Sequence, residues 1–211
     1  MLEFVIGMRQ RKDTLIAQVK SRVRDIAIPA VEELDRHNWL SDGSLNNIDL
    51  SNVNLEDAEL LRASFEYANL VEGNLQRAKL YRANFQGAIL QRVNFTDADL
   101  SFANLAEADL TNAILTRADL FHADLSGAFM SQINLQHAAL QNANLQGAFM
   151  FAANLRGANL KNASLQNAFL ENADLYNAKL EGAELEGAVY NSETVWPDDF
   201  NPDGAEMRKS R

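Results

Sequence analysis

A large apolar residue recurs at every fifth position of this chain, without an insertion, from Leu45 to Tyr190. The residue two places earlier is nearly always Ala, and the residue between the two is mostly Asn, Asp or Ser. A period of five fits neither the 3.6-residue α-helix nor the two-residue alternation of a continuous strand. It fits a short extended segment followed by a turn, in which the Ala and the large residue face inward and polar residues form the corner.

The exceptions to the repeat indicate how many units make one coil. Beyond the first turn, the inward Ala is replaced at Gly73, Val93 and Ile133, which are separated by multiples of twenty residues. The outward polar position becomes apolar at a second set of positions, again separated by multiples of twenty: Ile89, Phe129, Phe149, Phe169 and Val189. Ile114 is the one outlier. Four units therefore return the chain to the same face, which predicts a solenoid of square cross-section.

With their uninterrupted A(N/D)Lxx units, residues 45–190 resemble the pentapeptide-repeat family. The resemblance implies an all-β solenoid, namely a right-handed, four-sided (quadrilateral) parallel β-helix; this is also the hand expected of parallel crossover connections. Coils should stack at the ~4.8 Å spacing of hydrogen-bonded strands, so that each large side chain lies above its counterpart twenty residues earlier.

The two flanks of the repeat are expected to cover its ends, because a bare solenoid end exposes apolar core and unpaired strand edges. We interpret residues 1–44 as an N-terminal helical cap, 45–190 as the β-helix, and 191–211 as a C-terminal cap and tail. Within the first flank, apolar residues recur at the spacing of an amphipathic helix that covers about residues 13–28: Leu15, Ile16, Val19, Val23 and Ile26. Pro29 favours a kink there and the start of a second helix that ends near Arg36.

Two placements of these helices are open: they roof the first coil, or they lie along one outer face of the rod. That face carries a large side chain in each of the first four coils: Leu61, Tyr81, Phe102 and Phe121. At the other end, Trp196 and Phe200 interrupt the repeat and resemble the Trp-Pro…Phe tail that closes many pentapeptide-repeat domains. We expect these two rings to pack over the last Leu layer and residues 207–211 to fray.

The sequence does not contain a residue pattern typical of catalysis. Cysteine is absent, and the three histidines, His37, His122 and His137, lack the spacing of metal ligands or of a Ser/His/Asp group. Aspartate recurs because the turn favours it, and a glycine-rich phosphate loop is missing. We expect no enzyme activity, no cofactor and no metal site.

Charge and hydropathy limit the class of partner. The formal net charge of −10 opposes non-specific binding to nucleic acid, which requires Lys and Arg to neutralise phosphates. No window approaches the ~20 apolar residues that span a bilayer, and residues 1–7 are too short, and acidic too early, for a secretory signal. We expect a cytoplasmic protein without direct nucleic-acid binding or membrane insertion.

One outward column is the candidate interaction site. Phe129, Phe149, Phe169 and Val189 follow one another over consecutive coils, with Phe151 beside them. Water-facing positions in this repeat normally hold Asn or Asp, so stacked Phe side chains indicate an apolar patch of the kind that often marks an interface. The alternative is that residues 191–211 fold back over the column and make it internal.

Two functions are considered. The first is a rigid, non-catalytic scaffold that docks a protein partner, or a second copy as a homodimer, through this face. A variant of this function is a local adaptor in a larger assembly, and the sequence does not distinguish the two. The second is implied by the family resemblance, because some relatives protect DNA gyrase, a topoisomerase, by imitating duplex DNA. Residues 45–190 hold 17 acids and 9 bases, a net charge of −8. A duplex of ~35 Å carries about twenty negative charges per strand pair, so the gyrase function ranks second.

Overall fold

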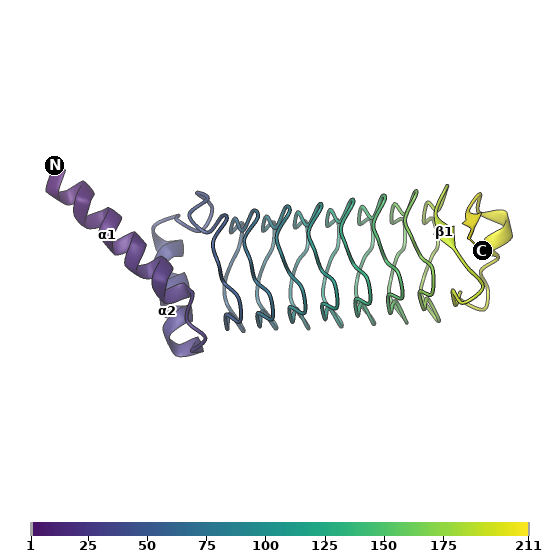
Figure 1. Ribbon diagram of the computed structural model, residues 1–211, viewed down its shortest axis with the longest axis horizontal. Coiled ribbons are helices and arrows are strands. Elements are labelled where there is room, and N and C mark those ends of the chain that lie inside the picture. The colour runs from purple at the N-terminus through teal and green to yellow at the C-terminus, as the bar shows by residue number, and fades with distance from the viewer. Residues whose placement is uncertain (1, 211) are drawn as a thin grey trace.

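The computed structural model describes residues 2–210, and the side chains of all of these except residues 2, 3 and 203. Helix α1 spans Leu2–Val19 and helix α2 spans Arg24–Arg36. A row of similar coils follows and forms a rod, with the helices at one end and the C-terminal segment at the other (Figure 1). That last segment contains strand β1 (Val189–Tyr190), the short 3-10 helix η1 (Pro202–Gly204) and strand β2 (Arg208–Lys209).

Each coil is joined to the next by parallel bridges between residues twenty apart. The bridges begin with Asp49↔Asn69 and continue in steps of five residues to Phe169↔Val189. One coil therefore has four bridges, one for each five-residue unit, and four sides. This confirms the solenoid predicted from the exceptions to the repeat. Each extended side is too short to form a regular strand, so bridges take the place of strands along the rod.

A turn of constant conformation forms each corner. The N–H of the Ala position donates to the carbonyl of the preceding central residue, as from Ala63 to Leu60 O at 3.1 Å. The residue two places after the centre has a left-handed φ, for example +58° at Arg62, as at the second central position of a type II turn. The outward Asn or Asp braces the turn, as where Asn69 Oδ1 accepts from the N–H of Val71 at 3.1 Å.

The inward side chains fill the rod. Every central side chain from Leu45 to Leu175 is buried. Aromatic residues stack inside as well: the rings of Phe65 and Phe85, one coil apart, have centroids 5.0 Å apart. Burial of each such side chain contributes about 2 kcal/mol, so the stacked core is the main source of stability and holds the outer faces in fixed positions.

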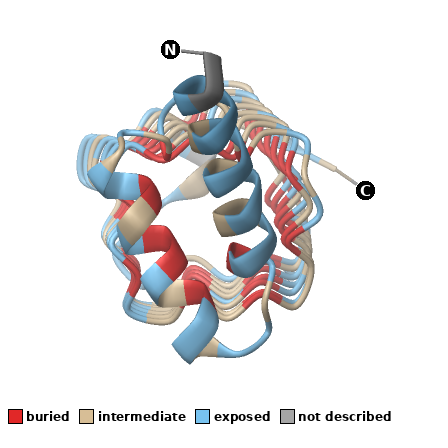
Figure 2. Ribbon diagram, turned by 90° about the vertical axis from the view of Figure 1, so that its left-hand side faces the viewer, coloured by how far each residue is buried: buried red, intermediate tan, exposed pale blue. Residues whose placement is uncertain are grey.

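Helix α2 roofs the first coil. Its buried residues, Ala27, Ala30, Val31 and Leu34, join the core of the rod. Helix α2 lies across the open end of the coils (Figure 2), and α1 points away from the rod (Figure 1). Of the two placements considered for the helices, this is the one observed. Leu61 and Phe102, on the outer face that was the other option, remain exposed.

The helix boundaries differ from those predicted. The break between the helices lies at residues 20–23, and Pro29 stands inside α2 instead of at its first position. Because Pro29 lies in the second turn of α2, its missing N–H removes one bond, the one to the carbonyl of Asp25. Helix α1 begins at Leu2, well before Asp13. Its first half was missed because it leaves apolar side chains such as Phe4 exposed and so lacks a one-sided apolar pattern.

An extra residue ends the regular repeat at the C-terminus. Asp174 is bridged to Val195, a separation of 21 residues, and the intervening turn is held by Thr194, whose Oγ1 donates to Leu170 O at 2.9 Å. Trp196 therefore packs against the core together with Phe200, as the sequence predicts. Their ring centroids are 4.9 Å apart.

The last residues extend the rod by one further rung. Strand β2 pairs in parallel with β1, with Val189 opposite Arg208 and Tyr190 opposite Lys209. The N–H of Ser210 donates to Tyr190 O at 2.7 Å. The predicted fraying of residues 207–211 is therefore wrong as far as Ser210, because these residues complete the backbone hydrogen bonds of the last coil.

Candidate protein-interaction site

Four outward side chains line one face of the rod near its C-terminal end. We name Phe129, Phe149, Phe169 and Val189 the phenylalanine column. Successive members are bridged backbone to backbone, and they occupy the repeat position at which the same face carries Asp49, Asn69 and Asp109 in other coils. The sequence prediction that these residues share one face is confirmed by this register.

The rings of the column stack on one another. The centroids of Phe129 and Phe149 are 5.1 Å apart with an interplanar angle of 6°, and those of Phe149 and Phe169 are 4.8 Å apart with an angle of 4°. Coil spacing and ring thickness permit this parallel arrangement, because strands ~4.8 Å apart place outward side chains at about stacking distance.

The column is open to solvent. Phe129 is 49% exposed, Phe149 is 37% exposed and the neighbouring Phe151 is 45% exposed, whereas Phe169 and Val189 are half-buried. The C-terminal residues do not fold back over the column. Residues 206–210 instead continue along the rod beyond Val189.

The surroundings of the column are almost free of charge. Residues 125–170 contain no Asp or Glu, and their only Lys and Arg residues are Arg156 and Lys161. These two follow the sides of Asn154 and Asn159, not the side of Phe149. At the corner before the column, Gly127 and Gly147 carry no side chain, with φ of +64° and +66°. The patch is therefore apolar along its centre, and charged residues adjoin it only towards its two ends, where Asp109 is bridged to Phe129 and Arg208 is paired with Val189.

A second aromatic cluster lies nearer the helical cap, at a different corner. The ring of Phe102 meets those of Tyr81, Phe121 and His122, with centroids 5.1–5.7 Å apart. The Arg82 guanidinium lies over the rings of Tyr81 and Phe102, at 5.3 and 5.8 Å. The sequence suggested this face only as a seat for the helices. The rings instead contact one another and a cation of their own chain.

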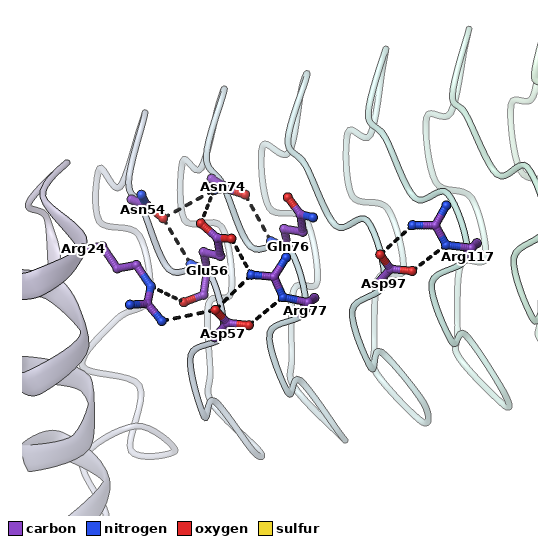
Figure 3. Close-up of polar contacts among 9 residues, drawn as sticks. All are labelled: Arg24, Asn54, Glu56, Asp57, Asn74, Gln76, Arg77, Asp97 and Arg117. Atoms are coloured by element: carbon purple, nitrogen blue, oxygen red, sulfur yellow. Dashed lines mark hydrogen bonds and ion pairs between the residues drawn. The ribbon is translucent and has the colours of Figure 1, made fainter.

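Charged side chains form a ladder along another corner (Figure 3). Arg24 of α2 contacts Asp57, and Asp57 contacts Arg77 one coil later, with Arg77 Nε and Asp57 Oδ1 2.7 Å apart. Further along, Arg117 Nη2 and Asp97 Oδ2 are 2.6 Å apart. Hydrogen bonds from Arg117, and then its charge, lower the pKa of Asp97 below its usual range. Acidic and basic side chains therefore alternate along this corner of the rod.

The three histidines lie apart from one another. His37 stacks on Trp39 in the cap, His122 stacks on Phe102, and the His137 ring lies over Gly157. Among the described residues, no group of three or more His, Cys, Asp or Glu side chains is placed to hold a metal ion. In the same part of the chain, neither helix has the length and apolar character needed to cross a membrane.

Two surface hollows lie at the ends of the rod. One, of about 520 Å³, is between the cap and the first coils, and its lining includes Asp35, Leu40 and Arg62. The other, of about 430 Å³, is between the last coil and the tail, and its lining includes Lys179 and Phe200. Neither hollow is lined by a residue of the phenylalanine column.

Several solved structures are similar to this chain. HetL, a pentapeptide repeat protein involved in heterocyst differentiation regulation from the cyanobacterium Nostoc sp. strain PCC 7120, is 29% identical with a TM-score of 0.49, over 76% of this chain and 83% of that one. The pentapeptide repeat protein alr5209 from Nostoc PCC 7120 is 35% identical with a TM-score of 0.35, over 53% and 84%. QnrB1, a plasmid-mediated fluoroquinolone resistance protein, is 15% identical with a TM-score of 0.37, over 79% and 93%.

No curated protein matches the chain. The sequence does match the family described as pentapeptide repeats, in eight copies that cover residues 44–80, 78–117, 113–150 and 153–189. These matches account for most of the chain and coincide with the coils that the bridges define. The chain therefore belongs to the pentapeptide-repeat family.

Proposed function

We propose that this protein is a rigid, non-catalytic scaffold that docks a protein partner through the phenylalanine column. The observation that carries the proposal is the exposure of three rings. Phe129 and Phe149 occupy a position that holds Asn or Asp in three of the four coils before them, and Phe151 lies beside Phe149. Contiguous apolar surface of this kind is unfavourable in water unless another molecule covers it.

The uncharged surroundings support a protein partner. Interface centres are depleted in charged residues and enriched in aromatic ones. The stretch of 46 residues from Leu125 to Leu170 has no acidic side chain, although the chain as a whole has 29. A partner that docks here would therefore bury few unpaired charges, which is the main cost of covering a polar surface.

The stiffness of the rod supports the same function. Each unit of the column is held by backbone hydrogen bonds to the coils on both sides. Phe149 N–H donates to Ala128 O in the coil before at 2.9 Å, and Met150 N–H donates to Phe169 O in the coil after at 2.8 Å. The rings are further fixed by stacking. Little conformational freedom remains to be lost on binding, which favours affinity from a small patch.

Gyrase or another topoisomerase ranks second as a partner. A DNA mimic requires a continuous row of negative charge, but Arg77 and Arg117 pair with Asp57 and Asp97 along the charged corner. On another face Arg92 pairs with Glu72. Duplex DNA is uniformly negative along its backbone, so these alternating pairs favour the scaffold.

A photo-crosslinking experiment tests the scaffold function. The photoreactive amino acid p-benzoyl-phenylalanine is placed at Phe149, or at Ile114 as a control, and the protein is irradiated in the cells that produce it. Ile114 suits the control because it is 42% exposed but lies on another face. We expect a protein adduct of defined mass only from position 149. No adduct there, or the same adducts from both positions, would contradict the proposal.

A further inference from the structure

We infer that the protein docked on the phenylalanine column is a second copy of this chain, which lies antiparallel with Phe149 against Phe149. This rests on the proposed function and names its partner. The pattern of the apolar patch, its neighbours and the distribution of charge along the rod each point to this arrangement.

The apolar patch has an approximate two-fold symmetry. Phe149 and Phe151 belong to one coil, Phe129 lies one coil before them, and Phe169 lies one coil after. A half-turn about an axis that crosses the face through Phe149 places Phe149 and Phe151 on their own counterparts. The same rotation places Phe129 on Phe169. Every ring of one copy therefore meets a ring of the other, which is the self-complementarity that a two-fold interface requires.

The residues beside the rings fit this rotation. Ser131, Phe151 and Glu171 occupy equivalent positions in three successive coils, so the half-turn places Ser131 of one copy opposite Glu171 of the other. A hydroxyl can donate to a carboxylate, and like charges do not meet at this point. On the other side of the column, Gly127 and Gly147 leave the corner without side chains and so permit close approach.

The charge of the C-terminal end favours the antiparallel over the parallel arrangement. Residues 171–211 contain ten acidic and four basic residues, so this end has a net charge of −6. Parallel rods in contact along the column would bring these two acidic ends side by side, within a few Debye lengths of each other. Antiparallel rods separate them, because each acidic end then lies beside the middle of the other rod.

The size of the patch predicts a weak, reversible dimer. The exposed fractions of Phe129, Phe149 and Phe151 amount to about 300 Å² of ring surface per copy for side chains of 150–250 Å² each. Even with the flanking polar residues, the interface falls at the low end of specific interfaces. The expected state is a monomer–dimer equilibrium in the micromolar range, not a permanent dimer.

Sedimentation velocity of the full chain tests the identity of the partner. From roughly 5 to 500 µM, the wild type should shift from monomer towards dimer, as expected for a small interface. Phe149→Asp with Phe169→Asp should raise the dissociation constant at least about tenfold, since central aromatic residues dominate interfaces. Asp fits the backbone here, because Asp109 holds the same position. Ile114→Asp is the matched control and should dimerise like the wild type.

Disulfide crosslinking tests the arrangement. The chain has no cysteine, so an introduced thiol can pair only with another introduced thiol. Under mild oxidation, a mixture of Ser131→Cys and Glu171→Cys proteins should give a heterodimer, and each protein alone should give little. Ile114→Cys should not crosslink above background.

The outcomes separate the two proposals. A column-dependent dimer with the mixed disulfide supports the inference. A wild type that stays monomeric at every concentration overturns the inference. The scaffold function is then still tested by the photo-crosslinking experiment at position 149. A dimer that survives both Asp substitutions overturns the inference and also contradicts docking through the column. A column-dependent dimer that forms disulfides between identical positions overturns the antiparallel arrangement.

Discussion

The ring of Phe149 lies parallel to the ring of Phe169, twenty residues later, with centroids 4.8 Å apart and planes 4° apart. This relationship joins the core of the rod to its surface. Buried side chains set the twenty-residue coil, and the coil sets the spacing of the outward side chains. That spacing allows rings to stack at a position where Asp49, Asn69 and Asp109 stand in other coils.

The stack should contribute to stability as well as to binding. Phe149 stacks on both Phe129 and Phe169, and each such pair contributes about 0.5–1.5 kcal/mol. Loss of both pairs in Phe149→Asn should therefore lower the free energy of unfolding by about 1–3 kcal/mol. Urea denaturation, at protein concentrations too low for a dimer, measures this loss. Ile114→Asn is the control, because Ile114 is bridged to Asn94 and Asn134. Equal losses for the two variants would contradict a role for ring stacking.

Corner glycines should differ in their tolerance of alanine. Gly87 and Gly147 have φ of +62° and +66°, so a Cβ is unfavourable at both by about 1–2 kcal/mol. At Gly87 the added Cβ would also stand 2.4 Å from Cε1 of Tyr67, whereas at Gly147 it meets nothing within 4 Å. Gly87→Ala should therefore lower the Tm more than Gly147→Ala.

A second background checks the cause of that difference. In a Tyr67→Ala protein the obstructing ring is gone, so Gly87→Ala and Gly147→Ala should then lower the Tm equally. A difference that persists without the Tyr67 ring would show that the contact is not its source.

The ion pair between Asp97 and Arg117 should be visible in a titration. Arg117 lowers the pKa of Asp97 below its ordinary 3.8, so Arg117→Gln should move the pKa of Asp97 upward, as measured by NMR of the side-chain carboxyl carbon. A carboxyl with a depressed folded-state pKa stabilises the protein above its unfolded pKa, and loses this effect as the pH falls through the folded value. The stability difference between wild type and Arg117→Gln should thus be present at pH 7 and fade below about pH 4.

Salt and a second arginine provide the controls for that titration. The pair is on the surface, so 1 M salt should reduce the shift at Asp97. Arg77→Gln should chiefly raise the pKa of Asp57, its direct partner. An Asp97 pKa that is the same in wild type and Arg117→Gln would contradict the pairing.

The helical cap should be required for a soluble rod. Val31 and Leu34 of α2 are fully buried within the core that includes Leu45 and Leu50. Deletion of residues 1–38 exposes this apolar layer and the strand edge beside it, which favours aggregation. We expect aggregates in size-exclusion chromatography or a large fall in Tm. An unchanged monomer with the wild-type Tm would contradict the cap.

The coils and the composition of the column could be predicted from sequence because one period fixes both. A residue such as Phe149 must stand above Phe129 if each coil has twenty residues and no insertions. The predicted break at Pro29 was wrong because a proline in an early helical turn disrupts only one hydrogen bond, so α2 continues through it. The sequence pattern does not show whether a helix ends at such a proline or continues through it.

The exposure of the column could not be predicted, because it depends on residues outside the repeat. The extra residue before Val195 and the pairing of Arg208 with Val189 direct the tail along the rod. Both are tertiary hydrogen-bonding arrangements without a periodic signal. The face with Phe102 was one of two predicted docking sites for the helices, because its large side chains can be identified in the sequence. The sequence does not show which part of the rod the helices cover.

Solvent access to individual phenylalanine rings tests the central claim most directly. The protein is labelled with 4-fluoro-phenylalanine, kept dilute enough to be monomeric, and studied by fluorine NMR with a soluble paramagnetic agent. We expect strong relaxation of the signals from Phe129, Phe149 and Phe151, and little effect on those of the buried Phe65 and Phe85. Signals of Phe129, Phe149 and Phe151 that are as protected as those of these two core rings would contradict an exposed column.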